Sequence, residues 1–123
     1  MLTIGAIVLG VEDMARGVDF WSQALGYAPR AGEASEEWTV LEPVFGSGTP
    51  LALDVSETPV QEQPRIHLDL FARDEAEQLA EVDRLIALGA RRVDWDLYPE
   101  DADFIVLADT EANIFCVVDT SRT

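Results

Sequence analysis

The sequence runs through the same order of secondary-structure signals twice. An apolar, β-branched segment (residues 3–11) predicts a strand, Asp13 follows where a helix N-cap belongs, and Gly26 stands where that helix ends. Asp74 repeats the N-cap signal about 61 residues after Asp13, and Gly89 repeats the stop. A single repetition at so long a period indicates a duplicated supersecondary unit and not a solenoid.

Each copy predicts one strand, one helix and then three more strands. In the first copy, the strands cover 3–11, 27–30, 37–42 and 51–56, and the helix covers 13–25. In the second copy, the strands cover 65–72, 91–95, 103–107 and 114–119, and the helix covers 74–88. The apolar faces expected to bury the helices are Val18, Phe20, Trp21 and Leu25 in the first and Leu79, Val82, Leu85 and Ile86 in the second.

Composition narrows the classes of partner. Hydrophobic residues make up 48% of the 123 residues, which predicts a packed globular domain. Acidic residues number 24 against 8 basic ones, all of them Arg, so the formal net charge is −16. Such a charge repels nucleic acid and anionic membranes, and it favours a cationic small molecule as the partner. The single cysteine, Cys116, excludes an internal disulfide and is consistent with a cytoplasmic location.

Alternation along the strands predicts which side chains share a face. In the fifth strand Ile66, Leu68 and Leu70 are expected to pack on the helix, which puts His67, Asp69 and Phe71 on the opposite face. The same rule puts Asp54 and Cys116 on the faces that the helices do not cover. A surface that mixes apolar residues with a few convergent polar groups is the usual form of a ligand site.

The chain resembles the vicinal oxygen chelate superfamily, in its glyoxalase-like branch. The segments that carry the resemblance are 11–21 with 25–27, 65–70, 88–92 and 106–116, in that order along nearly the whole chain. The resemblance implies an α+β fold of two tandem βαβββ modules, whose mixed sheets curl around one cleft. It implies one domain over residues 1–123, with modules at about 1–60 and 61–123. The turn at 109–113 departs from the family's Asp-Pro-Glu-Gly-Asn pattern, with Thr110 for Pro and Ala112 for Gly.

Metal-dependent members of that superfamily place one ligand on each of four strands, usually His, Glu, His and Glu. The resemblance carries these positions onto Ala6, Asp54, His67 and Cys116, with Ala6 matched to His67 and Asp54 to Cys116 across the repeat. Ala6 offers no ligand atom, and Cys116 offers a soft thiol where the family has a carboxylate. We therefore expect no cofactor and no tightly held metal; a divalent ion, if bound, would take Asp54, His67 and Cys116.

Each candidate site residue also has a structural interpretation. His67 is a candidate acid or base in the cleft, or a hydrogen-bonded core residue. Asp69 could orient His67 or contact a ligand, or it could be a solvated strand residue. Trp38 could stack on a ligand, or pack in the core. The acidic segment 94–103 predicts an exposed loop at the edge or mouth of the cleft.

Three functions follow from these observations. The first is a small-molecule binding protein that works without metal, with Trp38, Asp54, His67, Asp69 and Cys116 in contact with the ligand. The second is a metal-dependent lyase, isomerase or dioxygenase, and the third is a subunit with no ligand of its own. The set of metal ligands is incomplete, because Ala6 offers no ligand atom, and this favours the first function. Chains with this fold commonly pair, so we expect a homodimer.

Overall fold

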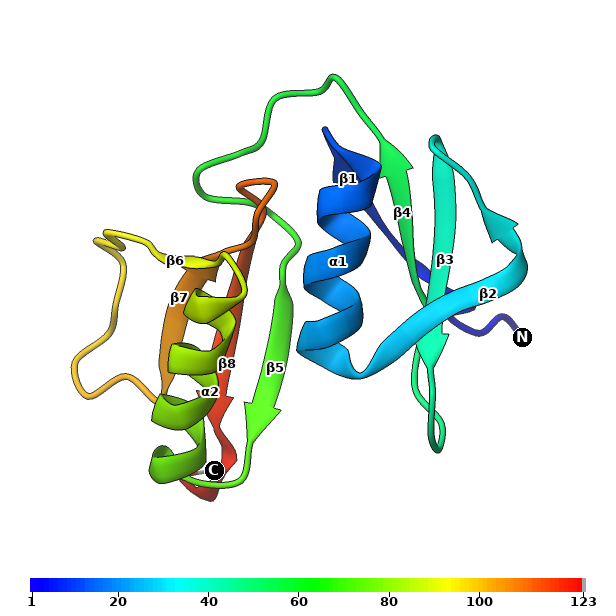
Figure 1. Cartoon of the computed structure of the whole chain (residues 1–123). Helices are drawn as coiled ribbons and strands as arrows, with labels where there is room; N and C mark the ends of the chain where they lie inside the picture. Colours follow the sequence, from blue (N-terminus) through cyan, green and yellow to red (C-terminus); the bar gives the residue numbers. More distant parts are fainter. Residues whose placement is uncertain (123) are drawn as a thin grey trace. The chain divides into compact units, whose positions relative to one another are not determined.

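The computed structural model describes residues 1–122 and divides the chain into two compact units, Met1–Pro59 and Val60–Thr123 (Figure 1). Each unit consists of one strand, one helix and three further strands, in that order along the chain. The sequence-based prediction of two tandem βαβββ modules in an α+β fold is confirmed.

The first unit forms a four-stranded mixed sheet in the order β1-β4-β3-β2. Strands β1 and β4 are parallel, and the other neighbours are antiparallel. A parallel pair needs a long crossover, which here contains the helix and the two intervening strands. The elements are β1 (Ile7–Val11), α1 (Met14–Leu25), β2 (Tyr27–Ala34), β3 (Trp38–Pro43) and β4 (Leu51–Val55).

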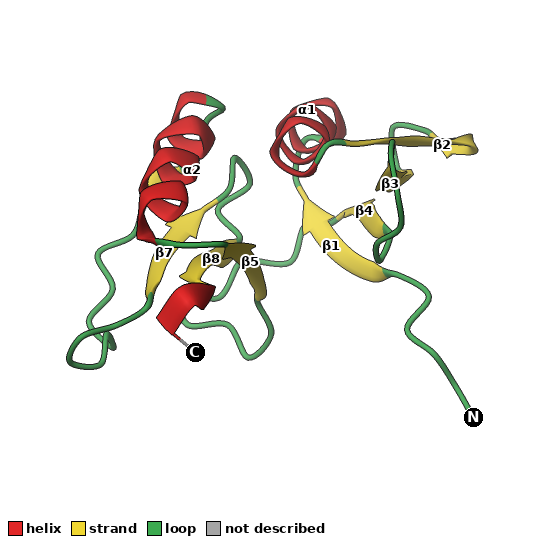
Figure 2. Cartoon of the chain, turned by 90° about the horizontal axis from the view of Figure 1, so that it is seen from below, coloured by secondary structure: helices red, strands yellow, loops and turns green. Residues whose placement is uncertain are grey.

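The second unit repeats this topology with the strand order β5-β8-β7-β6, in which β5 and β8 are parallel. Figure 2 shows each helix lying over one face of the sheet of its own unit. Among residues 1–122, the α-helix of each unit therefore leaves the opposite face of its own sheet uncovered. The elements are β5 (Leu68–Ala72), α2 (Glu75–Ala87), β6 (Arg91–Arg92), β7 (Phe104–Ala108), β8 (Ile114–Asp119) and a 3-10 turn (Thr120–Arg122).

Both helices begin at the predicted aspartates. The side chain of Asp13 accepts a hydrogen bond from the backbone N–H of Arg16 at 3.1 Å, and that of Asp74 accepts one from Glu77 at 2.8 Å. These bonds satisfy backbone donors that have no partner inside the helix. The first helix ends at Gly26, whose φ of 69° is the left-handed conformation that glycine adopts without strain.

The core of each unit lies between its helix and its sheet. In the first unit the rings of Phe20 and Trp21 meet edge to face at 5.1 Å, and both are buried. Gly17 allows α1 to approach the sheet closely, because a Cβ at this position would lie 2.9 Å from Cγ1 of Val11. In the second unit the buried residues of α2 and β8 include Val82, Leu85, Phe115 and Val117.

The structure corrects the starts of two predicted strands. β1 begins at Ile7 and not at residue 3, and β5 begins at Leu68 and not at residue 65. The reason is pairing: β1 first meets its partner at Ile7, and β5 does so at Leu68. Ile66 therefore lies before the strand, is 83% exposed and does not pack on the helix as expected.

The buried face of α2 is also rotated from the predicted one. Val82 and Leu85 are buried as expected, but Leu79 is 44% exposed and Gln78 is only 6% exposed. The amide of Gln78 donates hydrogen bonds to the backbone carbonyls of Asp103 and Val117, each at 3.0 Å. A polar side chain thus occupies a core position because two backbone carbonyl groups accept hydrogen bonds from its amide.

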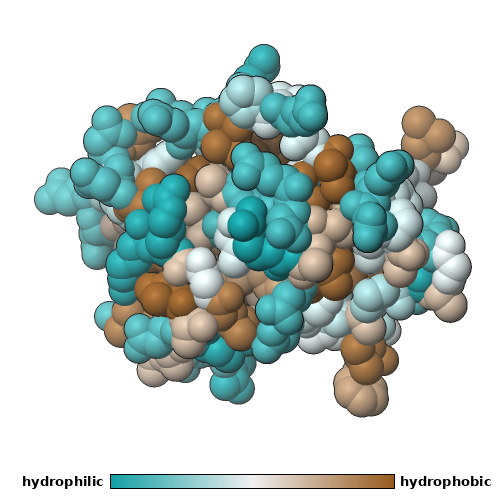
Figure 3. Space-filling view, turned by 45° about the horizontal axis from the view of Figure 1, so that its top comes forward, coloured by the Kyte–Doolittle hydropathy of each residue, from teal (hydrophilic) through white to brown (hydrophobic). Residues whose placement is uncertain are grey.

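Hydrophilic residues cover most of the surface seen in Figure 3, and hydrophobic residues are exposed between them. Within residues 1–122, no helix combines the length and the apolar character that crossing a membrane requires. Phe71 is a large apolar side chain of the second sheet that is 76% exposed.

Candidate functional site

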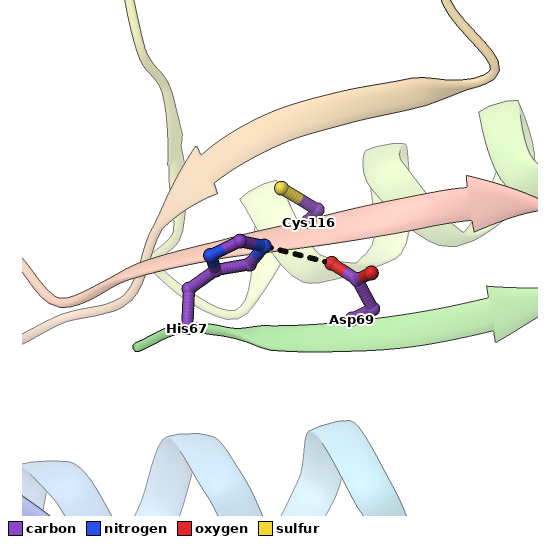
Figure 4. A group of neighbouring side chains, drawn as sticks. All are labelled: His67, Asp69 and Cys116. Carbon is purple, nitrogen blue, oxygen red and sulfur yellow. Dashed lines mark ion pairs between the residues drawn. The ribbon is translucent and has the colours of Figure 1, made fainter. Parts of the chain in front are cut away.

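Three side chains with metal-binding or acid–base chemistry gather on one face of the second sheet (Figure 4). Asp69 on β5 and Cys116 on β8 are register partners across the parallel strand pair, and His67 directly precedes β5. One ligand atom from each residue lies within 4.8 Å of the others. Alternation along β8 puts Cys116 opposite the helix-facing Phe115 and Val117, as the sequence predicts.

His67 and Asp69 form an ion pair when the imidazole is protonated. Nε2 of His67 lies 3.1 Å from Oδ1 of Asp69, and the two side chains are 42% and 49% exposed. His67 is therefore a surface residue, and its interpretation as a core histidine does not hold. The contact orients the imidazole, so the interpretation of Asp69 as a residue that positions His67 agrees with the geometry.

Cys116 is buried beside this pair, with 5% of its surface exposed. Burial raises the pKa of its thiol to about 11, and the charge and hydrogen bond of Asp69 act in the same direction. A thiolate in this position would be poorly solvated and would lie next to a carboxylate, so the neutral thiol is favoured. The side chain is therefore a weak nucleophile at neutral pH.

The strand registers correct one correspondence between the two halves of the chain. Ile7, the first residue of β1, pairs with Leu51, and Leu68, the first residue of β5, pairs with Phe115. Asp69, the second residue of β5, pairs with Cys116, and Val8, the second residue of β1, pairs with Ala52, so Cys116 corresponds to Ala52. Asp54 corresponds to Val118. The match of Asp54 to Cys116, made from the sequence, is wrong by two residues.

This correction leaves the first unit without ligand atoms at the matching positions. Ala6 stands before β1 as His67 stands before β5, and Ala52 corresponds to Cys116. The position of Asp69 is taken by Val8 in the first unit. The three-residue group of His67, Asp69 and Cys116 therefore has only aliphatic counterparts in the other half of the repeat.

Trp38 and Asp54 lie together on the first unit, opposite each other on the antiparallel strands β3 and β4. Residues directly opposite on such strands point to the same face. The indole N–H of Trp38 donates to Oε2 of Glu33 at 3.3 Å, and both Trp38 and Asp54 are exposed. The structure thus does not support the interpretation of Trp38 as a core residue.

Tyr98 is a residue of the site region that the sequence analysis missed. It lies in the acidic loop 94–103, and its hydroxyl oxygen accepts a hydrogen bond from the backbone N–H of Val106 at 2.7 Å. Its ring packs against Phe104 at 5.3 Å. By alternation, Phe104 and Val106 share the face of Cys116, so Tyr98 anchors the loop beside this face. The sequence signal that could have identified Tyr98 is a single tyrosine within an acidic segment.

Solved structures with the same fold include proteins of the glyoxalase/bleomycin resistance/dioxygenase group. A family enzyme from Burkholderia phytofirmans PsJN is 16% identical with a TM-score of 0.75, over 96% of this chain and 98% of that chain. A glyoxalase-related enzyme from Fulvimarina pelagi is 20% identical with a TM-score of 0.72, over 97% and 88%. A mutant of the fosfomycin resistance protein FosX from Listeria monocytogenes, complexed with Mn(II) and a dihydroxypropylphosphonic acid, is 14% identical with a TM-score of 0.73, over 96% and 90%.

No curated protein matches the sequence. At identities of 20% and below, the solved structures show a shared fold and no more. The model of the glyoxalase-like domain matches residues 6–118, which is nearly the whole chain and includes both copies of the repeated unit. The chain therefore belongs to the glyoxalase-like domain family.

Proposed function

We propose that this protein binds a small molecule on the face of the second sheet that carries His67 and Asp69. The observation that supports it best is the exposed pair of polar side chains set among apolar ones. Phe71 is exposed on the same strand, and Val106 lines the sheet beside Cys116. A few oriented polar groups on an apolar surface are the usual composition of a binding site for a small organic molecule.

The ligand proposed is a small organic cation. The carboxylate of Asp69 can pair with a positive group, and His67 can exchange a proton with the ligand. The net charge of −16 draws cations toward the protein. On the first unit, the exposed ring of Trp38 beside Asp54 is a second surface of the same chemical character, because an indole face and a carboxylate both attract cations.

The donor atoms in the chain do not fit the kind of metal found in FosX. That protein is complexed with Mn(II), a hard ion that prefers carboxylate and other oxygen ligands. Here Ala6 and Ala52 stand where the second unit has His67 and Cys116, and the group itself contains only one carboxylate. We therefore favour binding without a resident hard ion over metal-dependent lyase, isomerase or dioxygenase chemistry.

The test is a binding survey that uses the only histidine as a reporter. The ring protons of His67 give a single assignable set of NMR signals, so a ligand at this face shifts them without ambiguity. A panel of guanidinium, quaternary ammonium and cationic glycopeptide compounds would be titrated into the protein. We expect at least one compound to bind with a Kd below about 1 mM, a free energy of about −4 kcal/mol, and to shift the His67 signals.

Two substitutions with matched charge identify the site. Asp69→Asn should weaken binding of that compound at least tenfold, roughly the loss of one charge-assisted contact. Asp83→Asn removes the same charge from an exposed position on α2 and should leave affinity within about twofold. Equal weakening by both variants would mean that the total charge of the protein attracts the ligand. A panel without any binder would count against the proposal itself.

A further inference from the structure

An exposed indole ring lies beside a carboxylate that has no partner on the first unit. Trp38 on β3 and Asp54 on β4 are directly opposite in an antiparallel ladder, so their Cβ atoms lie about 4.5–5.5 Å apart on one face. Trp38 is 37% exposed, and Asp54 is exposed as well. Within residues 1–122, no hydrogen bond or ion pair engages the side chain of Asp54.

The position of the indole ring is fixed by its neighbours. At the turn between β2 and β3, the hydroxyl of Ser35 accepts a hydrogen bond from the backbone N–H of Trp38 at 3.1 Å, and the backbone N–H of Ser35 donates to the carbonyl of Trp38 at 2.9 Å. The indole N–H donates to Oε2 of Glu33 at 3.3 Å. A ring held in this way loses little conformational entropy when a ligand contacts its face.

Asp54 is the carboxylate of this group that is left to pair with a ligand. Glu33 is engaged twice, by the indole N–H and by Nη1 of Arg30 at 3.7 Å. Arg30 also contacts Oε2 of Glu42 at 2.9 Å, so the nearby arginine is held on the β2 side of the ring. The negative charge of Asp54 therefore has no counterpart among the described residues.

A glycine keeps the position beside Asp54 open. Gly10 on β1 pairs with Asp54, so Trp38, Asp54 and Gly10 form one row across three neighbouring strands. A Cβ at position 10 would lie 3.1 Å from Cβ of Ser56 and would crowd it. Because Gly10 has no side chain, the carboxylate of Asp54 is not covered from this side of the row.

The two groups select a class of cation. The face of an indole ring attracts a cation that lies within about 6 Å of its centre, and a carboxylate opposite the ring adds a second attraction. A primary ammonium is strongly hydrated and carries three N–H donors, for which this surface offers a single unengaged carboxylate. A quaternary ammonium has no N–H donors, and its methyl groups can pack directly on the ring.

We propose that Trp38 and Asp54 form a binding site for a quaternary ammonium group. The site is contained in the first unit and shares no residue with the face that carries His67 and Asp69. It therefore goes beyond the small-molecule binding proposed for the second sheet. Failure of either proposal leaves the other in place, because one is read at Trp38 and the other at His67.

The test compares choline with ethanolamine, which carry the same charge and differ by three methyl groups. Each compound would be titrated into the full chain at constant ionic strength, with the indole N–H signals of the three tryptophans followed by NMR. The signal that disappears in Trp38→Leu is that of Trp38. We expect choline to shift it in a saturable way and to bind at least about threefold more tightly than ethanolamine. The signal of Trp21, which is buried in the core, shows that each variant is folded.

Three variants, followed through the backbone amide signals of β3 and β4, identify the contacts. Trp38→Leu and Asp54→Asn should each weaken choline binding at least about threefold. Asp69→Asn has the same charge change as Asp54→Asn and should leave the affinity within about twofold. Three outcomes would overturn the proposal: a Trp38 signal that choline does not move, equal affinity for ethanolamine, or equal weakening by Asp54→Asn and Asp69→Asn.

Discussion

Asp69 and Cys116 face each other across the parallel strands β5 and β8, and the carboxylate of Asp69 changes the chemistry of the thiol. Burial and the Asp69 carboxylate together raise the pKa of the Cys116 thiol to about 11. The same carboxylate lies 3.1 Å from the imidazole of His67. One aspartate therefore orients a histidine and keeps a cysteine in its neutral form.

The thiol of Cys116 should react slowly at neutral pH and faster as the pH rises. With a pKa of about 11 in place of about 8.5 for a free cysteine, its thiolate fraction at pH 7.5 falls roughly a hundredfold or more. We expect the rate of alkylation by iodoacetamide, followed by mass spectrometry, to keep rising between pH 9 and about pH 11. Asp69→Asn should move this rise to lower pH. A rate that levels off below pH 9 would contradict the prediction.

Gln78 should contribute more to stability than its neighbour Leu79. Gln78→Met keeps the size of the side chain but removes both hydrogen bonds to the carbonyls of Asp103 and Val117. We expect it to lower the free energy of unfolding by about 1–3 kcal/mol. Leu79→Ala, on the exposed side of α2, should cost less than about 1 kcal/mol. Urea unfolding of the two variants measures both changes in stability. A larger loss in Leu79→Ala than in Gln78→Met would support the buried helix face that the sequence predicted.

The fold could be predicted from local signals in the sequence. The N-caps at Asp13 and Asp74 and the stop at Gly26 mark the helices, and their repetition gives the order of elements. The buried face of α2 was harder to predict, because Gln78 is buried only through carbonyls that come from distant segments. No pattern within the helix reveals those acceptors.

The candidate site, like the fold, could be predicted from the sequence only in part. Alternation places His67, Asp69 and Cys116 on one face, since side chains of a strand point to opposite sides in turn. Alternation does not fix the register, because a shift of two residues keeps every side chain on its face. The sequence could therefore place Asp54 on the correct face and still match it to Cys116 in place of Ala52.

The turn at Asp109 provides a test of backbone strain. The carboxylate of Asp109 accepts hydrogen bonds from the backbone N–H groups of Glu111 and Asn113, each at 2.8 Å, and these bonds fix the turn. Within this turn Ala112 adopts a φ of 66°, where a side chain costs about 1–2 kcal/mol. Ala112→Gly should raise the free energy of unfolding by about 0.5–1 kcal/mol after the greater entropy of the unfolded chain is counted. Ala80→Gly, in the interior of α2, should lower it by about 1 kcal/mol.

Protein purified without added metal should carry much less than one metal ion per chain. Only three ligand atoms are available in the group, two of the residues are exposed, and the thiol must lose a proton to bind. Elemental analysis measures the content directly. One equivalent of zinc, nickel or iron that disappears in His67→Ala would show a resident metal and would place the enzyme hypothesis first.

The last prediction is that the protein forms a homodimer. β1 and β5 each lie at the edge of a sheet, and a strand edge offers unpaired backbone groups to a second chain. Both edge strands also carry an exposed apolar side chain, Val8 on β1 and Phe71 on β5. Covering such residues with a second copy removes apolar surface from water, at about 25 cal/mol for each Å² buried.

Sedimentation equilibrium at micromolar concentration should therefore give twice the mass of the chain. Val8→Lys and Phe71→Lys place a charge on the two edge strands, and at least one of them should shift the equilibrium toward monomer. Leu79→Lys, at an exposed position on α2, adds the same charge away from the strand edges and should leave the dimer intact. A clean monomer mass for the unchanged protein would mean that these edges stay exposed to water.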